Sequence, residues 1–359
     1  MLMKRKRWSV VMWCGVVAAA LAVLVVRSVR AAPPYSFDPT EQAARMTKLV
    51  ELLGDPDYRV RQQAQDELSR LGYDAVDALT AAQTHEDLEV SKRVRYLLRQ
   101  LKVELLEDDD PPQVKSELSG YERQDEPGRR QRIRQLANLQ GAMGAPALCR
   151  VVRFEPSKVL SKVAAVEVLK LDFPQGNAGR QRGELLGKSL GASLRPGAMW
   201  IRIFVQAQAA PDDMLATWRE LTRAEETLQA DSPASTSNEV VLGLLGYQAQ
   251  LEKQLKHHGD AHRTMMQMIA LEGQPSPTLT KLIDELVNTQ DWQTLEAVAE
   301  QYPERINADA SLLYLLAEAR LKRGDKDLAN ELAARAAALY PTNRSAHVKL
   351  AYELGQRNL

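Results

Sequence analysis

Aromatic residues are scarce in this chain of 359 residues, where they make up only 5% of the sequence. Alanine, leucine, glutamine, glutamate, lysine and arginine dominate instead. These residues favour helices, whereas strands prefer aromatic and β-branched side chains. The composition therefore argues against a β-rich fold and predicts a nearly all-helical protein. A chain of this length has room for about two domains, each able to bury its own core.

Cysteine is nearly absent as well. Cys14 lies in an apolar N-terminal run without a lipoprotein-type context before it, and Cys149 is the only cysteine that follows. A disulfide within the chain beyond that run is therefore excluded, and the fold must rest on packing. Cys149 stands among apolar neighbours, which favours a buried and unreactive thiol over a nucleophile.

The sequence has no excess of charge of one sign, with 47 Lys and Arg against 47 Asp and Glu. Six of the cations precede the first acid, Asp38, so the rest of the chain carries 47 − 6 = 41 cations against 47 acids, a net charge of −6. Nucleic-acid-binding proteins usually gather basic side chains on one face. We therefore expect no nucleic-acid partner.

The N-terminus carries four consecutive cations at residues 4–7 and then an uncharged, mostly apolar run at residues 8–26. As a helix, that run would span about 28 Å, close to the thickness of a bilayer's hydrocarbon core. We expect residues 1–32 to be a signal anchor or a signal peptide, because the run is long for a cleaved signal although Ala31 lies in a tolerable cleavage context. The cations before the run outnumber those after it, which predicts a cytoplasmic N-terminus and an exported bulk. The chain is then a single-pass membrane protein or, alternatively, secreted after cleavage near Ala31.

Two similar helical patterns lie in the first half of the chain. Asp55-Pro56 opens the stretch DPDYRVRQQAQDELSRLG and Gly72 closes it, as start and stop signals of a helix do. The stretch HEDLEVSKRVRYLLRQL repeats the apolar spacing 30 residues later, and a shorter helical segment precedes each stretch. The apolar positions are Val60, Ala64, Leu68 and Leu71 in the first stretch and Val90, Val94, Leu98 and Leu101 in the second. This plan resembles HEAT repeats, and residues 144–171 follow it more loosely.

A different repeat pattern lies near the C-terminus, in the stretch SLLYLLAEARLKRGDKDLANELAARAAALYP. Its spacing resembles the tetratricopeptide repeat (TPR) of about 34 residues. The residues that carry this resemblance are Leu313, Leu316, Ala317, Gly324, Ala329, Ala333, Ala336 and Pro341. Small residues allow two antiparallel helices to approach, and Gly324 is expected to turn the chain between them. Weaker copies place turns at Gly259-Asp260 and Gln290-Asp291, and another helix pair is expected at residues 198–209 and 211–230.

Together these patterns are similar to the exported HEAT-plus-TPR repeat proteins of some bacteria. The resemblance implies an all-α fold, an α-solenoid of paired antiparallel helices preceded by one N-terminal apolar helix. HEAT-like repeats would fill residues 38–172, with a polar loop near 107–128. A linker would follow at 173–195, and TPR-like repeats would fill 196–359. Such families imply binding and assembly without a shared chemistry, because stacked repeats leave a long concave surface free.

The stretch Gly187-Lys188-Ser189-Leu190-Gly191 fits two catalytic patterns superficially. A phosphate-binding loop needs four residues between its glycines, but Gly183 and Gly187 enclose only three, and Arg182 stands where the glycine should be. A nucleophile elbow would place Ser189 at a turn from strand to helix above a parallel sheet, and no such sheet is expected. We therefore expect a helix here, with neither nucleotide binding nor hydrolase chemistry.

Metal ligation and cofactor binding are not expected either. His258 and His262 are spaced as zinc ligands on one helix are, and His257 precedes them, but the predicted turn at Gly259-Asp260 would separate the rings. The acidic run Asp108–Asp110 lacks the spaced ligands of a calcium loop, so it is interpreted as a solvated linker.

The function predicted from these patterns is a non-catalytic protein–protein interaction scaffold presented outside the cytoplasm. A structural component of the cell envelope is the alternative, and no constellation of nucleophile and base favours an enzyme. The expected ligand is a protein segment, either an extended peptide or a helix, because the predicted concave face mixes both charges with two tyrosines. The residues of that face are Lys281, Asp284, Asn288, Tyr314, Glu318, Lys322, Lys349 and Tyr352. An ordinary solvated surface remains the alternative interpretation of these positions.

Overall fold

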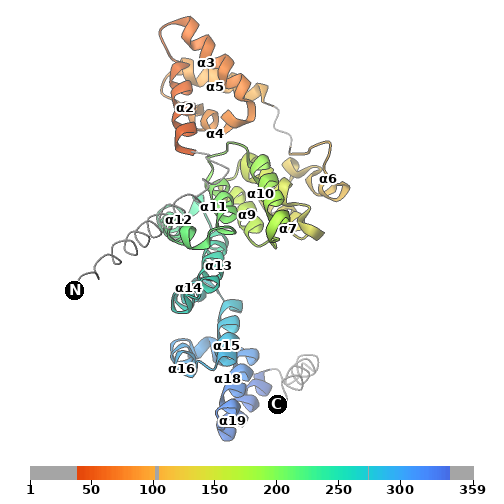
Figure 1. Cartoon of the computed structure of the whole chain (residues 1–359), viewed down its shortest axis with the longest axis vertical. Coiled ribbons are helices and arrows are strands. Elements are labelled where there is room, and N and C mark those ends of the chain that lie inside the picture. The colour runs from red at the N-terminus through yellow and green to blue at the C-terminus, as the bar shows by residue number, and fades with distance from the viewer. Residues whose placement is uncertain (1–38, 102–104, 274, 340–359) are drawn as a thin grey trace, which may run out of the picture. The chain divides into compact units, whose positions relative to one another are not determined.

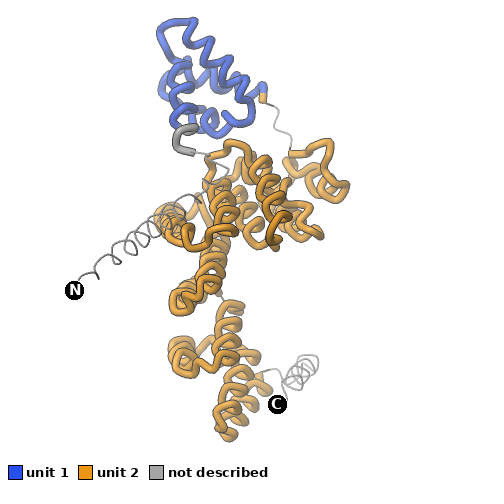
Figure 2. Tube along the Cα trace, in the orientation of Figure 1, with its two compact units in different colours: residues 1–100 blue, residues 101–359 orange. Residues whose placement is uncertain are grey.

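The computed structural model describes residues 39–101, 105–273 and 275–339 (Figure 1). All regular elements within these ranges are helices, which confirms the all-α class. The chain divides into two compact units, residues 1–100 and 101–359 (Figure 2). The apolar run at 8–26 lies outside the described residues. Among those that are described, no helix is long and apolar enough to cross a bilayer.

The described part of the first unit, residues 39–100, contains two helix pairs. Helices α2 (Pro39–Leu52) and α3 (Tyr58–Leu71) form one, and α4 (Val76–Ala81) and α5 (Leu88–Gln100) form the other. Asp57 begins α3 by accepting a hydrogen bond from the Arg59 backbone N–H. This arrangement matches the pattern of paired helices expected from the sequence. One detail differs, because Leu97 is the buried residue in the last turns of α5, whereas Leu98 and Leu101 are only half-buried.

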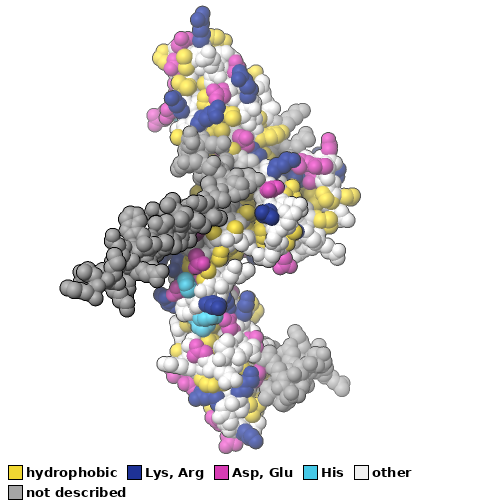
Figure 3. Space-filling model, viewed as in Figure 1, with side chains coloured by type: hydrophobic (Ala, Val, Ile, Leu, Met, Phe, Trp, Pro, Cys, Tyr) yellow, Lys and Arg dark blue, Asp and Glu magenta, His cyan; other side chains and the backbone are white. Residues whose placement is uncertain are grey.

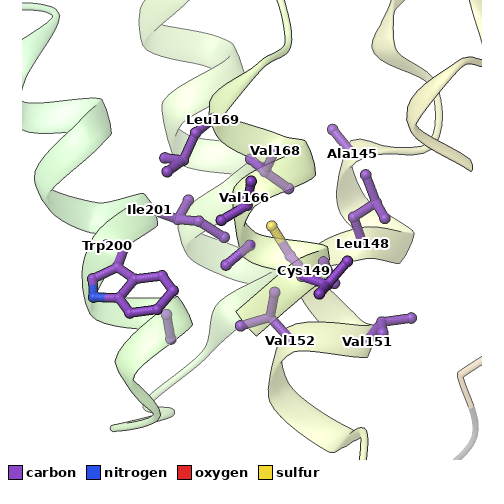
Figure 4. Packing of buried hydrophobic residues seen from close by; sticks show 14 of the residues in the cluster. Ala145, Leu148, Cys149, Val151, Val152, Val166, Val168, Leu169, Trp200 and Ile201 are labelled. Atoms are coloured by element: carbon purple, nitrogen blue, oxygen red, sulfur yellow. The ribbon is translucent and has the colours of Figure 1, made fainter. Parts of the chain in front are cut away.

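The second unit begins with a group of helices around one central helix. That helix is α9 (Lys158–Leu169), which packs against α7 (Glu126–Ala137), α8 (Ala145–Phe154), α11 (Pro196–Ala207) and α13 (Asn238–Gln254). Every residue from Leu160 to Leu169 is buried, because α9 has neighbours on several sides. Figure 4 shows Val152 of α8 and Val166 of α9 on the side of Trp200 and Ile201 of α11, whereas Leu148 and Val151 of α8 lie on the other side. Helix α12 (Pro211–Asp231) then pairs with both α11 and α13, as the expected helix pair requires.

The predicted linker at 173–195 is more helical than expected, because only the stretch around Gly187–Gly191 was expected to form a helix. Helix α10 (Gly176–Leu190) occupies most of the linker and packs on α8, with Leu186 and Leu190 buried in the core. Burial of these leucines outweighs the low helix propensity of the glycines in α10. The polar loop contains the short helix α6 (Pro112–Leu118) and the buried Tyr121, whose hydroxyl donates to Glu155 at 2.7 Å.

After α13, the helices of the second unit pack mainly on their neighbours along the chain. The helices after α13 are α14 (His258–Leu271), α15 (Pro277–Thr289), α16 (Trp292–Gln301), α17 (Pro303–Asn307), α18 (Ala310–Lys322) and α19 (Lys326–Leu339). Gly324 turns the chain between α18 and α19 with a φ of +87°, and Gln290 ends α15 in a left-handed conformation, as expected. The expected turn at Gly259-Asp260 is wrong. Helix α14 already begins at His258, and Lys256, with a φ of +62°, makes the turn instead.

Candidate functional site

Two grooves lie in the second unit, and they share one architecture. In each, the second helices of successive pairs form the walls and the first helix between them forms the floor. Helices α12 and α14 flank α13 in one groove, and α16 and α19 flank α18 in the other. Because the walls come from neighbouring pairs, each groove follows from the stacking of repeats.

The first groove is a cavity of about 210 Å³ between α12, α13 and α14, which we call the polar groove. Its lining is Arg219, Thr222, Arg223, Glu226, Leu245, Gln248, Glu252, Asp260, Arg263, Thr264 and Gln267. Glu252 lies on the floor and is only 1% exposed. It accepts hydrogen bonds from the Thr264 hydroxyl at 2.7 Å, the Gln248 amide at 3.1 Å and the Arg219 guanidinium at 2.8 Å. A buried carboxylate is tolerated only with such partners, so these bonds tie the three helices together.

The remaining charges of the polar groove are also largely matched. Asp260 accepts from Arg219 at 2.7 Å and also contacts Arg263. The hydrogen bond from Arg219 holds the pKa of the Asp260 carboxyl below its usual range. Burial raises the pKa of Glu226, and the nearby Arg223 opposes that effect. The polar groove is therefore chiefly a brace between helices, in which Arg219, Glu252 and Asp260 satisfy one another.

The second groove is a cavity of about 200 Å³ between α16, α18 and α19, which we call the apolar slot. Its apolar lining is Leu295, Ala299, Leu316, Ala319, Leu328 and Leu332. Ala299 and Ala319 leave room that larger side chains would fill. The slot therefore presents aliphatic surface between helices that are otherwise closely packed.

Charged side chains surround the mouth of the apolar slot. Glu296 of α16 lies between Arg320 and Arg323 of α18. Its hydrogen bond to Arg323 lowers the pKa of the Glu296 carboxyl, and the charge of Arg320 adds to the effect. The contact between the Arg320 guanidinium and the Glu296 carboxylate is longer, at 3.5 Å. Two guanidinium groups thus face one carboxylate, which leaves the mouth of the slot with an excess of positive charge.

Sequence reasoning missed both grooves. Leucines at positions 328 and 332, and Leu295 with Ala299, have the spacing of one helical face, but such spacing normally marks a core-facing stripe. Whether such an apolar stripe is covered depends on the neighbouring helix pair. The sequence pattern of a single helix does not show how that pair packs. The relevant signal is the run of alanines in α16, α18 and α19, because small side chains leave space between helices.

The residues expected on the concave face lie on α15 and α18, which pack against each other. Lys281 and Asn288 are exposed on α15, whereas Asp284 on that helix and Tyr314 on α18 are half-buried. Burial raises the pKa of Tyr314. The face as a binding surface stays a prediction, and its last two members, Lys349 and Tyr352, lie outside the described residues.

One member of that face departs from the expectation. Glu318 is 4% exposed and pairs with Lys322 at 2.9 Å. Helix α18 is enclosed because α15, α17 and α19 all pack against it, so a residue one turn after Tyr314 is buried rather than open to a ligand. In the described structure, Glu318 therefore forms an ion pair inside the fold and is not open to a ligand.

Ser189 has the geometry of neither catalytic pattern. It lies inside α10, where its hydroxyl donates to the Leu185 carbonyl at 3.0 Å. Gly191 ends the same helix, so the stretch Gly187–Gly191 forms no phosphate-binding loop and no turn between a strand and a helix.

The histidines considered as zinc ligands are arranged differently from the expectation. His258 and His262 share helix α14, four residues apart, so the turn thought to separate them does not lie between them. Figure 3 shows the histidine side chains near α14 beside both acidic and basic ones. Within the described ranges, no group of three His, Cys, Asp or Glu side chains is placed to hold a metal ion.

The acidic run is not wholly a solvated linker. Asp110 is buried and accepts from the Arg150 guanidinium at 2.7 Å, and Arg150 also donates to the Leu105 carbonyl at 2.8 Å. Arg150 lies in an apolar helix and needs a counter-ion there, which Asp110 supplies. Its neighbour Cys149 is fully buried, and burial raises the pKa of the thiol to about 12, as expected for an unreactive cysteine.

Comparison of the chain with protein-family models, with curated proteins and with solved structures gives no match in any of the three. The fold and the grooves define the class of protein, a helical-repeat-like chain built from successive helix pairs.

Proposed function

We propose that this chain is a non-catalytic scaffold that binds a protein or peptide partner outside the cytoplasm. The observation that carries the proposal is the apolar slot, an aliphatic groove left open between successive helix pairs with charged groups at its mouth. Helical-repeat proteins typically bind partners along surfaces created by stacking. The resemblance of α18 and α19 to a TPR, and of the first unit to HEAT repeats, supports the same function.

The proposed location rests on the sequence of the N-terminus. The cations at residues 4–7 and the apolar run at 8–26 favour a single-pass anchor with the bulk of the chain exported. A reporter enzyme that is active only outside the cytoplasm should work when fused after Leu359. A silent reporter would contradict export. N-terminal sequencing then separates an anchor, which keeps Met1 or Leu2, from a signal peptide cleaved near Ala31.

Binding can be tested by cross-linking in cells, followed by isolation of the full-length chain in detergent. We expect discrete partner proteins with the wild type and with the control Lys188→Glu, which changes an exposed residue of α10. A double variant of the predicted face, Lys281→Glu with Asn288→Ala, should reduce their recovery. Sedimentation with wall or membrane material alone, without a discrete partner, would instead indicate a structural role in the envelope.

A further inference from the structure

We propose that the apolar slot receives a leucine-sized side chain from a partner segment whose neighbouring residues are acidic. This inference rests on the proposed scaffold function and assigns it a recognition chemistry. Both halves of that chemistry come from residues that line the slot: an aliphatic interior and a cationic mouth.

The interior of the slot selects for an aliphatic side chain. Leu316 on the floor and Leu328 and Leu332 on the α19 wall form its apolar surface. Burial of further aliphatic area there is favourable because it removes apolar surface from water. The volume of about 200 Å³ is smaller than the roughly 300–1,000 Å³ of small-molecule pockets, so one or two side chains suit it better than a cofactor does.

The mouth of the slot selects for carboxylates beside that side chain. Arg320 and Arg323 are each about one-third exposed, and they share the single acid Glu296. The contact of Arg320 at 3.5 Å is longer than a typical charge-assisted hydrogen bond, so its donors are weakly engaged. A carboxylate of the partner would pair with this guanidinium, whereas a lysine would be repelled.

The polar groove is the weaker candidate for the same role. Its floor carboxylate, Glu252, already accepts bonds from Arg219, Gln248 and Thr264. A ligand there would have to replace hydrogen bonds within the protein, whereas the aliphatic lining of the apolar slot has no hydrogen bonds to break.

The test uses two labelled synthetic peptides and the full-length chain in detergent micelles. One peptide has a single leucine flanked by glutamates, and the matched peptide has lysines in place of the glutamates. Fluorescence anisotropy should detect binding of the acidic peptide, with affinity that falls as salt is raised. Binding of the lysine peptide with equal affinity would overturn the proposal.

Slot variants then locate the binding. Ala299→Leu fills the slot from the α16 wall and should weaken binding about tenfold, or about 1.4 kcal/mol. Ala297→Leu is the matched control, since it adds the same side chain at an exposed position of the same helix. The double variant Arg320→Gln with Arg323→Gln should also weaken binding about tenfold and remove most of the salt dependence. Helicity measured by circular dichroism must stay unchanged, and wild-type affinity in the folded Ala299→Leu variant would overturn the proposal.

Two further outcomes separate this proposal from others. The chain itself carries Leu88, 72% exposed and flanked by Asp87 and Glu89. If the protein self-associates and Leu88→Ser abolishes the association, the occupant of the slot is a second copy and the partner proposal is wrong. If the acidic peptide fails to bind while discrete partners still depend on Lys281 and Asn288, the slot proposal fails and the scaffold function stands.

Discussion

The two parts of the second unit are stabilised in different ways. In the first, helices α7 to α13 surround α9, whose side chains are buried from Leu160 to Leu169. In the second, helices α14 to α19 pack mainly on helices next to them in the sequence, apart from the contact between α15 and α18. A central helix makes the first part cooperative, whereas an array of pairs has nearest-neighbour stability. We therefore expect the first part to be the more rigid of the two, and the proposed binding surface lies in the second.

One ion pair from each part illustrates the difference. In the first part, the buried Lys162 binds Glu225 and the Ser235 carbonyl, which joins α9 to α12 and the segment after it. In the second part, Glu296 pairs at the surface with arginines of α18. Buried pairs are costly to break because they leave an uncompensated charge, whereas exposed pairs contribute little.

The largest expected effect is therefore at α9. Lys162→Met leaves the buried Glu225 without its partner and should lower the free energy of unfolding by about 3–5 kcal/mol. The control Lys170→Met removes a largely exposed lysine that pairs with Glu167, and its cost should stay below about 1 kcal/mol. Urea unfolding of both variants measures the difference. Similar losses for the two variants would mean that α9 is not the centre of a cooperative core.

A second substitution tests how closely α9 and α13 approach. A Cβ atom at Gly243 would lie 2.2 Å from Val166 Cγ1, so Gly243→Ala should cost about 1–3 kcal/mol. The matched control is Gly246→Ala in the same helix, where the nearest atom is Met268 Cε at 3.7 Å. That change should be neutral or stabilising, because alanine favours helices. Shortening the neighbour with Val166→Ala should partly rescue Gly243→Ala. Equal stability of the two alanine variants would contradict the close approach.

In the array of pairs, the expected effect is smaller and local. Ala329 is buried where α19 meets α18, so Ala329→Leu should overpack the pair and cost about 1–2 kcal/mol. Lys326→Leu, on the exposed first turn of α19, should change stability by less than about 0.5 kcal/mol. Hydrogen exchange should become faster in α18 and α19 of the first variant while exchange in α9 stays unchanged. Faster exchange in α9 as well would mean that the two parts unfold together.

The smallest effect depends on pH. Glu239 of α13 bonds Arg134 of α7 at 2.8 Å and also contacts Arg130. Burial alone would raise its pKa, but the bonds and charges of the two arginines outweigh burial and lower it. Because the folded pKa is lower than the unfolded one, Glu239 stabilises the fold above the unfolded pKa of about 4.3 and loses this contribution as the pH falls through the folded value.

The corresponding variant is Glu239→Gln. It should lose about 1 kcal/mol of stability at pH 7, since Arg134 is partly exposed, and the loss should disappear in acid. Chemical denaturation of the wild type and the variant across the pH range gives the difference, with Glu220→Gln, an exposed change on α12, as control. A stability difference between the wild type and Glu239→Gln that grows toward low pH would contradict the lowered pKa of Glu239.

The sequence predicted the elements that depend on local signals. The helix pairs and the turns at Gly324 and Gln290 follow from apolar spacing and turn residues, and the structure contains them. The errors occur where residues distant in the sequence determine burial and packing. Asp110 is buried because of Arg150, 40 positions away, and α10 belongs to the core rather than to a linker because its leucines pack among other helices. Likewise, the burial of Glu318 depends on α15, α17 and α19, which all pack against α18.

The most direct test of the central claim is site-specific photo-cross-linking in cells. A photoreactive amino acid would replace Leu328 in the apolar slot, Asn288 on α15, or Lys188 on α10 of the rigid part, each in the full-length chain. We expect discrete adducts with a partner protein from position 328. Position 288 should give weaker or equal adducts, and position 188 should give none. Adducts from position 188 alone, or equal adducts from all three, would contradict the assignment of binding to the array of helix pairs.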